Sequence, residues 1–69
     1  MVSYAMLWTK MKEHNLTKTQ LRVAAGLSTS TFAKLTKNEI VSLDVLVRIC
    51  KVLECQLSDI CWVEHKEGR

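Results

Sequence analysis

The sequence predicts an all-α fold of five short helices in a single domain. The 69 residues include no proline and only two glycines, so the chain lacks the turn residues that a many-stranded sandwich would require. The composition, 48% hydrophobic and 25% charged, is typical of a globular chain rather than a disordered one. A chain of this length forms one small core, which makes residues 1–69 one domain and excludes an enzyme with a deep cleft between two lobes.

One pattern recurs five times along the chain and marks the expected helix starts. A hydrophobic residue precedes a serine or threonine, and a second hydrophobic residue follows four positions after that hydroxyl. The hydroxyl can accept a hydrogen bond from an unpaired N–H of the first helical turn, while the two apolar side chains close over it. The five sets are Val2-Ser3 with Leu7, Leu16-Thr17 with Leu21, Leu27-Ser28 with Phe32, Val41-Ser42 with Leu46, and Leu57-Ser58 with Trp62.

The apolar residues that follow each hydroxyl recur at helical spacing and place the first two helices at residues 3–14 and 17–25. In the first helix, His14 lies near the end, where an imidazolium suits the helix dipole. In the second, Thr17 with Gln20 fits a capping box, and Gly26 after it suits a left-handed helix stop.

The same spacing places the remaining helices at residues 28–36, 42–53 and 58–64. The fifth is short and largely apolar, and it ends with Trp62 and Val63. These two side chains are expected either to close the core over the first helix or to form the contact between two subunits.

The connection between the second and third helices is very short. Only Gly26 and Leu27 separate Ala25 from Ser28, so residues 17–36 are expected to form a helix-turn-helix unit. At about 100° per residue, one arc of the third helix presents small side chains first and lysines behind them. Short side chains allow a helix to approach base edges in a major groove, and the lysines would meet phosphates. This arc contains Thr29, Ser30, Ala33, Lys34 and Lys37.

The formal net charge of +3 is divided unevenly along the chain. Residues 1–38 contain six Lys or Arg and one acidic residue, which gives +5, whereas residues 39–69 have a charge of −2. No acidic residue lies between Glu13 and Glu39. This asymmetry favours a polyanionic partner for the first half, most often nucleic acid.

Two consecutive stretches of the chain carry a family resemblance, LTKTQLRVAAGLSTSTFAKL and then NEIVSLDVLVRICKVLECQLSDI. They resemble the helix-turn-helix domain of the Cro/phage-repressor superfamily of bacterial and phage transcription regulators. More narrowly, they resemble the small single-domain members. The resemblance implies a repressor-like fold whose second helix crosses the DNA backbone and whose third helix enters the major groove. It further implies a sequence-specific regulator of transcription that binds double-stranded DNA. One helix covers a small footprint, so a homodimer on a two-fold operator is expected.

The resemblance also assigns site residues. The base-facing positions fall on Thr29, Ser30, Ala33 and Lys34, and Lys18 stands at the start of the second helix, where a polar group often reaches a phosphate or base. From the residues themselves, we also expect phosphate contacts at Thr17, Thr19, Arg22, Lys37 and Asn38. Two positions depart from the family pattern. Arg22 stands where a small residue is usual, so its stem must extend outward or the helix crossing must loosen, and an internal ion pair is the alternative role for it. Asn38 stands near a frequent glycine and can adopt the left-handed conformation.

Cys50, Cys55, Cys61 and His65 suggest a metal site, but only the first spacing fits structural zinc, and Cys50 falls on the apolar stripe of the fourth helix. We therefore expect no metal, no cofactor and no enzymatic activity. The odd number of cysteines favours reduced thiols and a cytoplasmic location. The longest apolar run, Tyr4 to Trp8, is too short for a membrane span, and no small-molecule effector is evident.

Two other functions are compatible with the same sequence. The first is a protein-interaction module, such as an antitoxin or anti-repressor, that uses these helices to occupy another protein. The second is a thiol- or metal-responsive switch.

Overall fold

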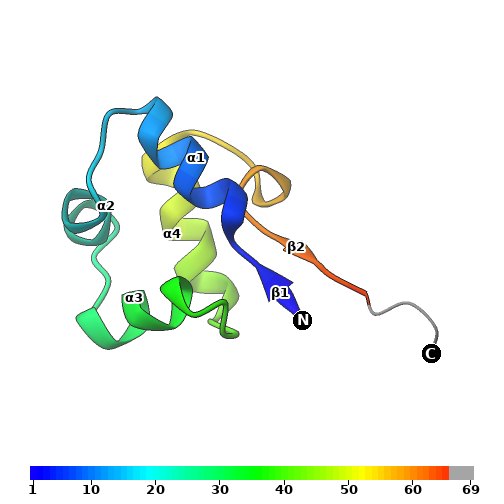
Figure 1. Cartoon of the computed structure of the whole chain (residues 1–69). Helices are drawn as coiled ribbons and strands as arrows, with labels where there is room; N and C mark the ends of the chain where they lie inside the picture. The colour runs from blue at the N-terminus through cyan, green and yellow to red at the C-terminus, as the bar shows by residue number, and fades with distance from the viewer. Residues whose placement is uncertain (66–69) are drawn as a thin grey trace.

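The computed structural model describes residues 1–65, which form four α-helices, one 3₁₀ turn and a two-stranded sheet (Figure 1). The helices are α1 (Ala5–Glu13), α2 (Lys18–Ala24), α3 (Thr29–Thr36) and α4 (Leu43–Leu53). The turn η1 (Leu57–Asp59) follows α4, and the strands are β1 (Val2–Ser3) and β2 (Trp62–Val63). The two strands together are called the β-ribbon below.

Three of the five predicted helix starts are confirmed. The hydroxyls of Thr17, Ser28 and Ser42 each accept a hydrogen bond from the backbone N–H three residues later, at the beginning of α2, α3 and α4. At α2, the Gln20 side chain also accepts from the N–H of Thr17 at 2.9 Å, so the predicted capping box is complete. These caps satisfy backbone donors that a helix leaves unpaired.

The two helix starts predicted at the chain ends are wrong. Ser3 lies in β1, so α1 begins only at Ala5, and the predicted fifth helix over residues 58–64 is replaced by η1 and β2. The strands pair antiparallel, with Val2 opposite Val63. Strand pairing satisfies the backbone at both chain ends at once, an alternative that a local helix pattern does not reveal.

The core lies among the four helices, and α1, α2, α3 and α4 contribute Leu7, Leu21, Leu35 and Ile49, each with no exposed surface. Ile60 after η1 is also fully buried. Trp62, in contrast, is 49% exposed, so its expected role in closing the core is wrong. Ile60 fills that role instead.

Each helix is followed by a residue with a positive φ angle. These residues are Asn15 (57°), Gly26 (69°), Asn38 (58°) and Glu54 (53°). The left-handed conformations predicted for Gly26 and Asn38 are therefore confirmed. Glycine and asparagine adopt this conformation at low cost, whereas a glutamate in it is strained.

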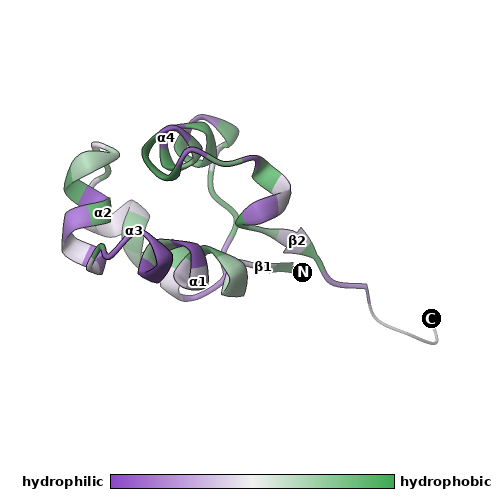
Figure 2. Cartoon of the chain, turned by 90° about the horizontal axis from the view of Figure 1, so that it is seen from above, coloured by the Kyte–Doolittle hydropathy of each residue, from purple (hydrophilic) through white to green (hydrophobic). Residues whose placement is uncertain are grey.

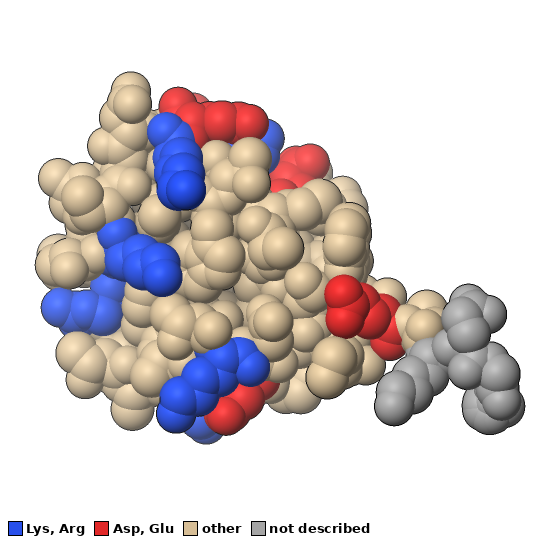
Figure 3. Space-filling view, in the orientation of Figure 1, with Lys and Arg blue, Asp and Glu red and all other residues tan. Residues whose placement is uncertain are grey.

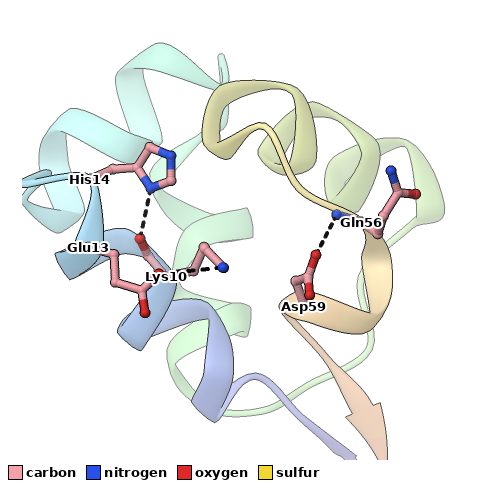
Figure 4. Close-up of polar contacts among 5 residues, drawn as sticks. All are labelled: Lys10, Glu13, His14, Gln56 and Asp59. Carbon is pink, nitrogen blue, oxygen red and sulfur yellow. Dashed lines mark hydrogen bonds and ion pairs between the residues drawn. The ribbon is translucent and has the colours of Figure 1, made fainter.

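Short polar contacts hold the end of α1 and the turn η1 (Figure 4). The Nδ1 atom of His14 lies 3.1 Å from the carbonyl oxygen of Lys10, and the Lys10 ammonium lies 3.4 Å from the Glu13 carboxylate. At η1, the Asp59 carboxylate accepts a hydrogen bond from the N–H of Gln56 at 2.9 Å. The position predicted for His14 at the helix end is thus confirmed.

Candidate nucleic-acid interface

The helices α2 and α3 form the predicted helix-turn-helix unit. Gly26 takes its positive φ in the connection, and Leu27 beside it is buried in the core. Both helices lie at one end of the molecule, and the β-ribbon lies at the other end in both ribbon views (Figures 1 and 2). The surface that α2 and α3 present is therefore separate from the β-ribbon.

Trp8 of α1 contacts both helices of this unit. Its ring packs edge-to-face against Phe32 of α3, with 5.7 Å between ring centroids. The ammonium of Lys18, at the start of α2, lies 4.8 Å from the centroid of the same ring, within the range of a cation–π contact. The sequence pattern placed Trp8 only in the core stripe of the first helix, and nothing in it indicated these two partners.

The outer face of α3 is arranged as its helical spacing predicts. Phe32 and Leu35 are buried, whereas Thr29, Ser30 and Lys34 are exposed and Ala33 is partly exposed. The hydroxyl of Ser28, which caps the helix, lies 3.2 Å from the Ser30 hydroxyl and 3.0 Å from that of Thr31. These contacts orient the short polar side chains at the leading end of α3.

The residues expected to meet phosphates have different surroundings. Thr17, Lys18 and Thr19 are exposed together at the start of α2, and Lys37 is exposed immediately after α3. All four are therefore accessible to a large ligand.

The Asn38 side chain, in contrast, has an internal partner, because its oxygen accepts a hydrogen bond from the N–H of Tyr4 at 3.0 Å. The buried Tyr4 also donates its hydroxyl to the carbonyl oxygen of Glu39 at 2.8 Å. Asn38 therefore connects the loop after α3 to the start of α1. The sequence suggested only its backbone conformation.

Two arginines contact the turn between α2 and α3. Arg22 is partly buried, and its Nη1 donates to the carbonyl oxygen of Leu27 at 3.1 Å. Arg48 of α4 donates to the carbonyl oxygen of Gly26 at 3.4 Å and forms an ion pair with Asp44 at 3.0 Å. Sequence reasoning missed Arg48. The four-residue spacing from Asp44 indicates an ion pair but not contact with a distant turn.

Basic side chains surround the helix-turn-helix unit on one face of the molecule. In Figure 3, Lys and Arg lie at the left edge, where α2 and α3 lie, without acidic neighbours, and they also lie at the top and bottom, where acidic side chains adjoin them. This arrangement matches the +5 charge of residues 1–38 and the absence of acidic residues between Glu13 and Glu39. A positive surface of this kind attracts polyanions.

The three cysteines are free thiols and partly buried. Burial, with the neighbouring Cys55 thiol as the next contribution, raises the pKa of Cys50 to about 11, and burial also raises the pKa of Cys61. A raised pKa lowers the fraction of thiolate, which is the form that binds metals and exchanges disulfides. Within residues 1–65 no three His, Cys, Asp or Glu side chains form a group that could hold a metal ion. In the same residues, no helix has the length and apolar character to cross a membrane.

Comparisons with known proteins agree with this geometry. Residues 6–66 match a family model described as a Cro/C1-type HTH DNA-binding domain. Among solved structures, the chain is similar to the crystal structure of a transcriptional regulator named VanUg. The two share 51% sequence identity with a TM-score of 0.86, over 88% of this chain and 81% of that chain. The comparison with curated proteins gives no match.

Proposed function

Because the chain belongs to the Cro/C1-type helix-turn-helix family of DNA-binding domains, we propose that it regulates transcription by binding a specific double-stranded operator as a homodimer. The observation that supports this most directly is the outer face of α3. It combines exposed Thr29, Ser30 and Lys34 with a buried face of Phe32 and Leu35, next to a tight turn. A helix presented in this way can enter a major groove.

In this proposal the two parts of the unit have different roles. Thr29, Ser30, Ala33 and Lys34 face the bases, and the start of α2 with Lys37 meets the phosphates. The Lys18 ammonium contacts the face of the Trp8 ring, which already restricts the side chain, so less side-chain entropy is lost when Lys18 pairs with a phosphate. Arg22 and Asn38 already have internal hydrogen-bond partners and are left out of the phosphate set.

The homodimer is supported by exposed apolar side chains on and beside α4. Ile40 is 75% exposed, Leu43 is 61% exposed, and Val47 lies one turn after Leu43. Val47 and Leu57 line a common hollow of about 460 Å³. Figure 2 shows the ribbon of α4 mostly in the colour of hydrophobic residues. An exposed apolar surface of this kind is typical of a protein contact, and a two-fold axis pairs it with itself.

The β-ribbon is the competing surface for the contact between subunits, because Trp62 and Val63 are exposed there. Each of its strands has only two residues. A pairing that short is marginal in water and would not fix two domains at a defined distance on DNA. We therefore place the second copy against α4.

Selection of bound duplexes from a random pool tests the function as a whole. The expected result is a two-fold symmetric site. The two lysines assigned to phosphates in each protomer, Lys18 and Lys37, would give a slope of about −3.6 for log K against log salt concentration, at about 0.9 for each phosphate contact. Failure of the wild-type chain to bind any duplex at low salt would contradict the proposal and favour the protein-interaction module.

Single substitutions test the assignment of roles. Lys37→Ala should lower affinity and reduce the salt slope by about 0.9 in each protomer, because Lys37 is assigned to a phosphate. Lys12→Ala, which removes an exposed lysine of α1, should change neither. Ser30→Arg should change the selected sequence rather than weaken all duplexes alike. If Ser30→Arg changes the affinity for all duplexes by the same factor, Ser30 does not face the bases.

Sedimentation equilibrium of two matched variants locates the contact between subunits. Leu43→Glu should yield monomers that bind the operator more weakly, because a charge is placed in an apolar contact. Val63→Glu introduces the same charge at an equally exposed position of the β-ribbon and should leave the dimer intact. The reverse result would place the contact at the β-ribbon.

A further inference from the structure

The turn between α2 and α3 is held by two guanidinium groups from different helices. Arg22 reaches forward from α2 to the carbonyl oxygen of Leu27 at 3.1 Å. Arg48 reaches across from α4 to the carbonyl oxygen of Gly26 at 3.4 Å, the longer of the two bonds. Two successive carbonyls of one short turn therefore each receive an arginine.

These carbonyls lie just beyond the end of α2, where the chain leaves the helix. The last carbonyls of α2 already have backbone partners, because the N–H of Gly26 donates to the Val23 carbonyl at 3.1 Å and the N–H of Leu27 donates to the Arg22 carbonyl at 3.0 Å. The two guanidinium groups add charge-assisted hydrogen bonds to the carbonyls of Gly26 and Leu27. They therefore supplement the backbone bonds of the turn, the positive φ of Gly26 and the burial of Leu27.

Arg48 is itself fixed on its other side. Its Nη2 lies 3.0 Å from the Asp44 carboxylate one turn earlier in α4, while Nη1 bonds to the turn. Nη1 also lies 4.0 Å from the position that a Cβ on Gly26 would occupy, so the guanidinium lies directly over the glycine. A planar fork can make both contacts at once, which a lysine ammonium on a flexible stem cannot do with the same geometry.

We infer that Arg22 and Arg48 are positioning residues, which fix the angle of α3 against α2 and α4 and strengthen DNA binding without touching DNA. This inference rests on the proposed function. It gives Arg22 a role through the turn in place of the phosphate contact expected from the sequence. It also connects α4, the helix proposed to meet the second copy, with the unit that meets DNA.

The salt dependence of operator binding separates a positioning role from a phosphate contact. For Arg22→Ala and Arg48→Ala we expect about a tenfold loss of affinity, the equivalent of one charge-assisted hydrogen bond, with an unchanged salt slope. A direct phosphate contact would instead reduce the slope by about 0.9 in each protomer. Lys12→Ala is the matched control, because it removes an exposed cation from α1, a helix outside the helix-turn-helix unit.

The conservative variant Arg48→Lys gives a second readout. It keeps the charge but loses the fork, so affinity should stay close to that of Arg48→Ala. Full rescue by lysine, or a reduced slope in either alanine variant, would overturn the inference. Urea unfolding of each variant identifies the conditions in which the chain is folded, and operator binding is measured under those conditions.

Hydrogen exchange of the free protein tests the same contacts without DNA. The amides of Gly26 and Leu27, which donate to the carbonyls of Val23 and Arg22, should exchange faster in Arg22→Ala and Arg48→Ala than in the Lys12→Ala control. Unchanged exchange in both arginine variants would overturn the inference even if the wild-type chain binds its operator. A wild-type chain that binds no duplex contradicts the proposed function, and the exchange rates then still decide whether the arginines hold the turn.

Discussion

The α2–α3 end and the β-ribbon end of the molecule are stabilised by different kinds of contact. At α2 and α3, helix caps join residues three apart, and Leu21 and Leu35 are completely buried. At the β-ribbon, Val2 pairs with Val63 across almost the whole chain, and Val63 is 65% exposed. The surface proposed to bind DNA is therefore built on well-packed helices, and the β-ribbon contributes no residue to it.

A pair of truncations gives the largest expected contrast between the two ends. Leu35→Ala should lower the free energy of unfolding by about 3 kcal/mol, since it leaves a cavity in the core. Val63→Ala should lower it by less than about 0.5 kcal/mol, as expected for an exposed side chain. Urea denaturation followed by circular dichroism measures both, and similar losses at the two sites would contradict the comparison.

The conformation of the turn gives the next largest effect. Gly26→Ala should lower the free energy of unfolding by about 1–2 kcal/mol, because a side chain disfavours a positive φ. A Cβ at this position would lie 4.0 Å from its nearest neighbour, so the loss comes from backbone strain and not from a clash. Gly26→Asn should cost less than the alanine variant. Equal losses of unfolding free energy in the alanine and asparagine variants would mean that backbone strain is not the main cause of the loss.

Ser28 and Ser58 occupy the same sequence pattern at the two ends, so the same substitution compares them directly. Ser28→Ala should cost about 1 kcal/mol, because it removes the hydroxyl that accepts from the N–H of Thr31. Ser58 begins no α-helix, and Ser58→Ala should have almost no effect on thermal unfolding. A comparable loss at Ser58 would show that η1 depends on that hydroxyl.

The smallest expected effect is a gain in stability at the end of α4. Glu54 has a φ of 53°, and Glu54→Gly should raise the free energy of unfolding by about 0.5–1 kcal/mol through relief of backbone strain. Asn15→Gly should give a smaller gain, since asparagine tolerates this conformation better. A loss at Glu54 would show that its side chain contributes contacts that offset the strain.

The features that the sequence predicted correctly depend on residues close together in the chain. The caps at Thr17, Ser28 and Ser42 and the left-handed stop at Gly26 each involve residues within a few positions of one another. The burial pattern of α3 follows from helical spacing in the same way. Local chemistry of this kind can be recognised without knowledge of the rest of the fold.

The features that could not be predicted depend on contacts between distant segments. Val2 and Val63 satisfy their backbones with each other, and a helix-start pattern contains no information about a partner about sixty residues away. The contact of Arg48 with Gly26 depends on how far a side chain reaches from one helix to another. The hydrogen bond from the N–H of Tyr4 to the Asn38 side chain likewise joins segments that are far apart in the chain. Arg22 is different, because its partner Leu27 is close in sequence, but the contact depends on how the turn after α2 folds.

Tyr4 has a practical consequence for handling this protein. It follows β1 directly, and it holds the loop after α3 through both its N–H and its hydroxyl. A purification tag fused ahead of Met1 would adjoin the hydrogen bonds between Met1 and Glu64, in the strand that leads directly to Tyr4. DNA affinity should therefore be measured on the chain with such a tag removed.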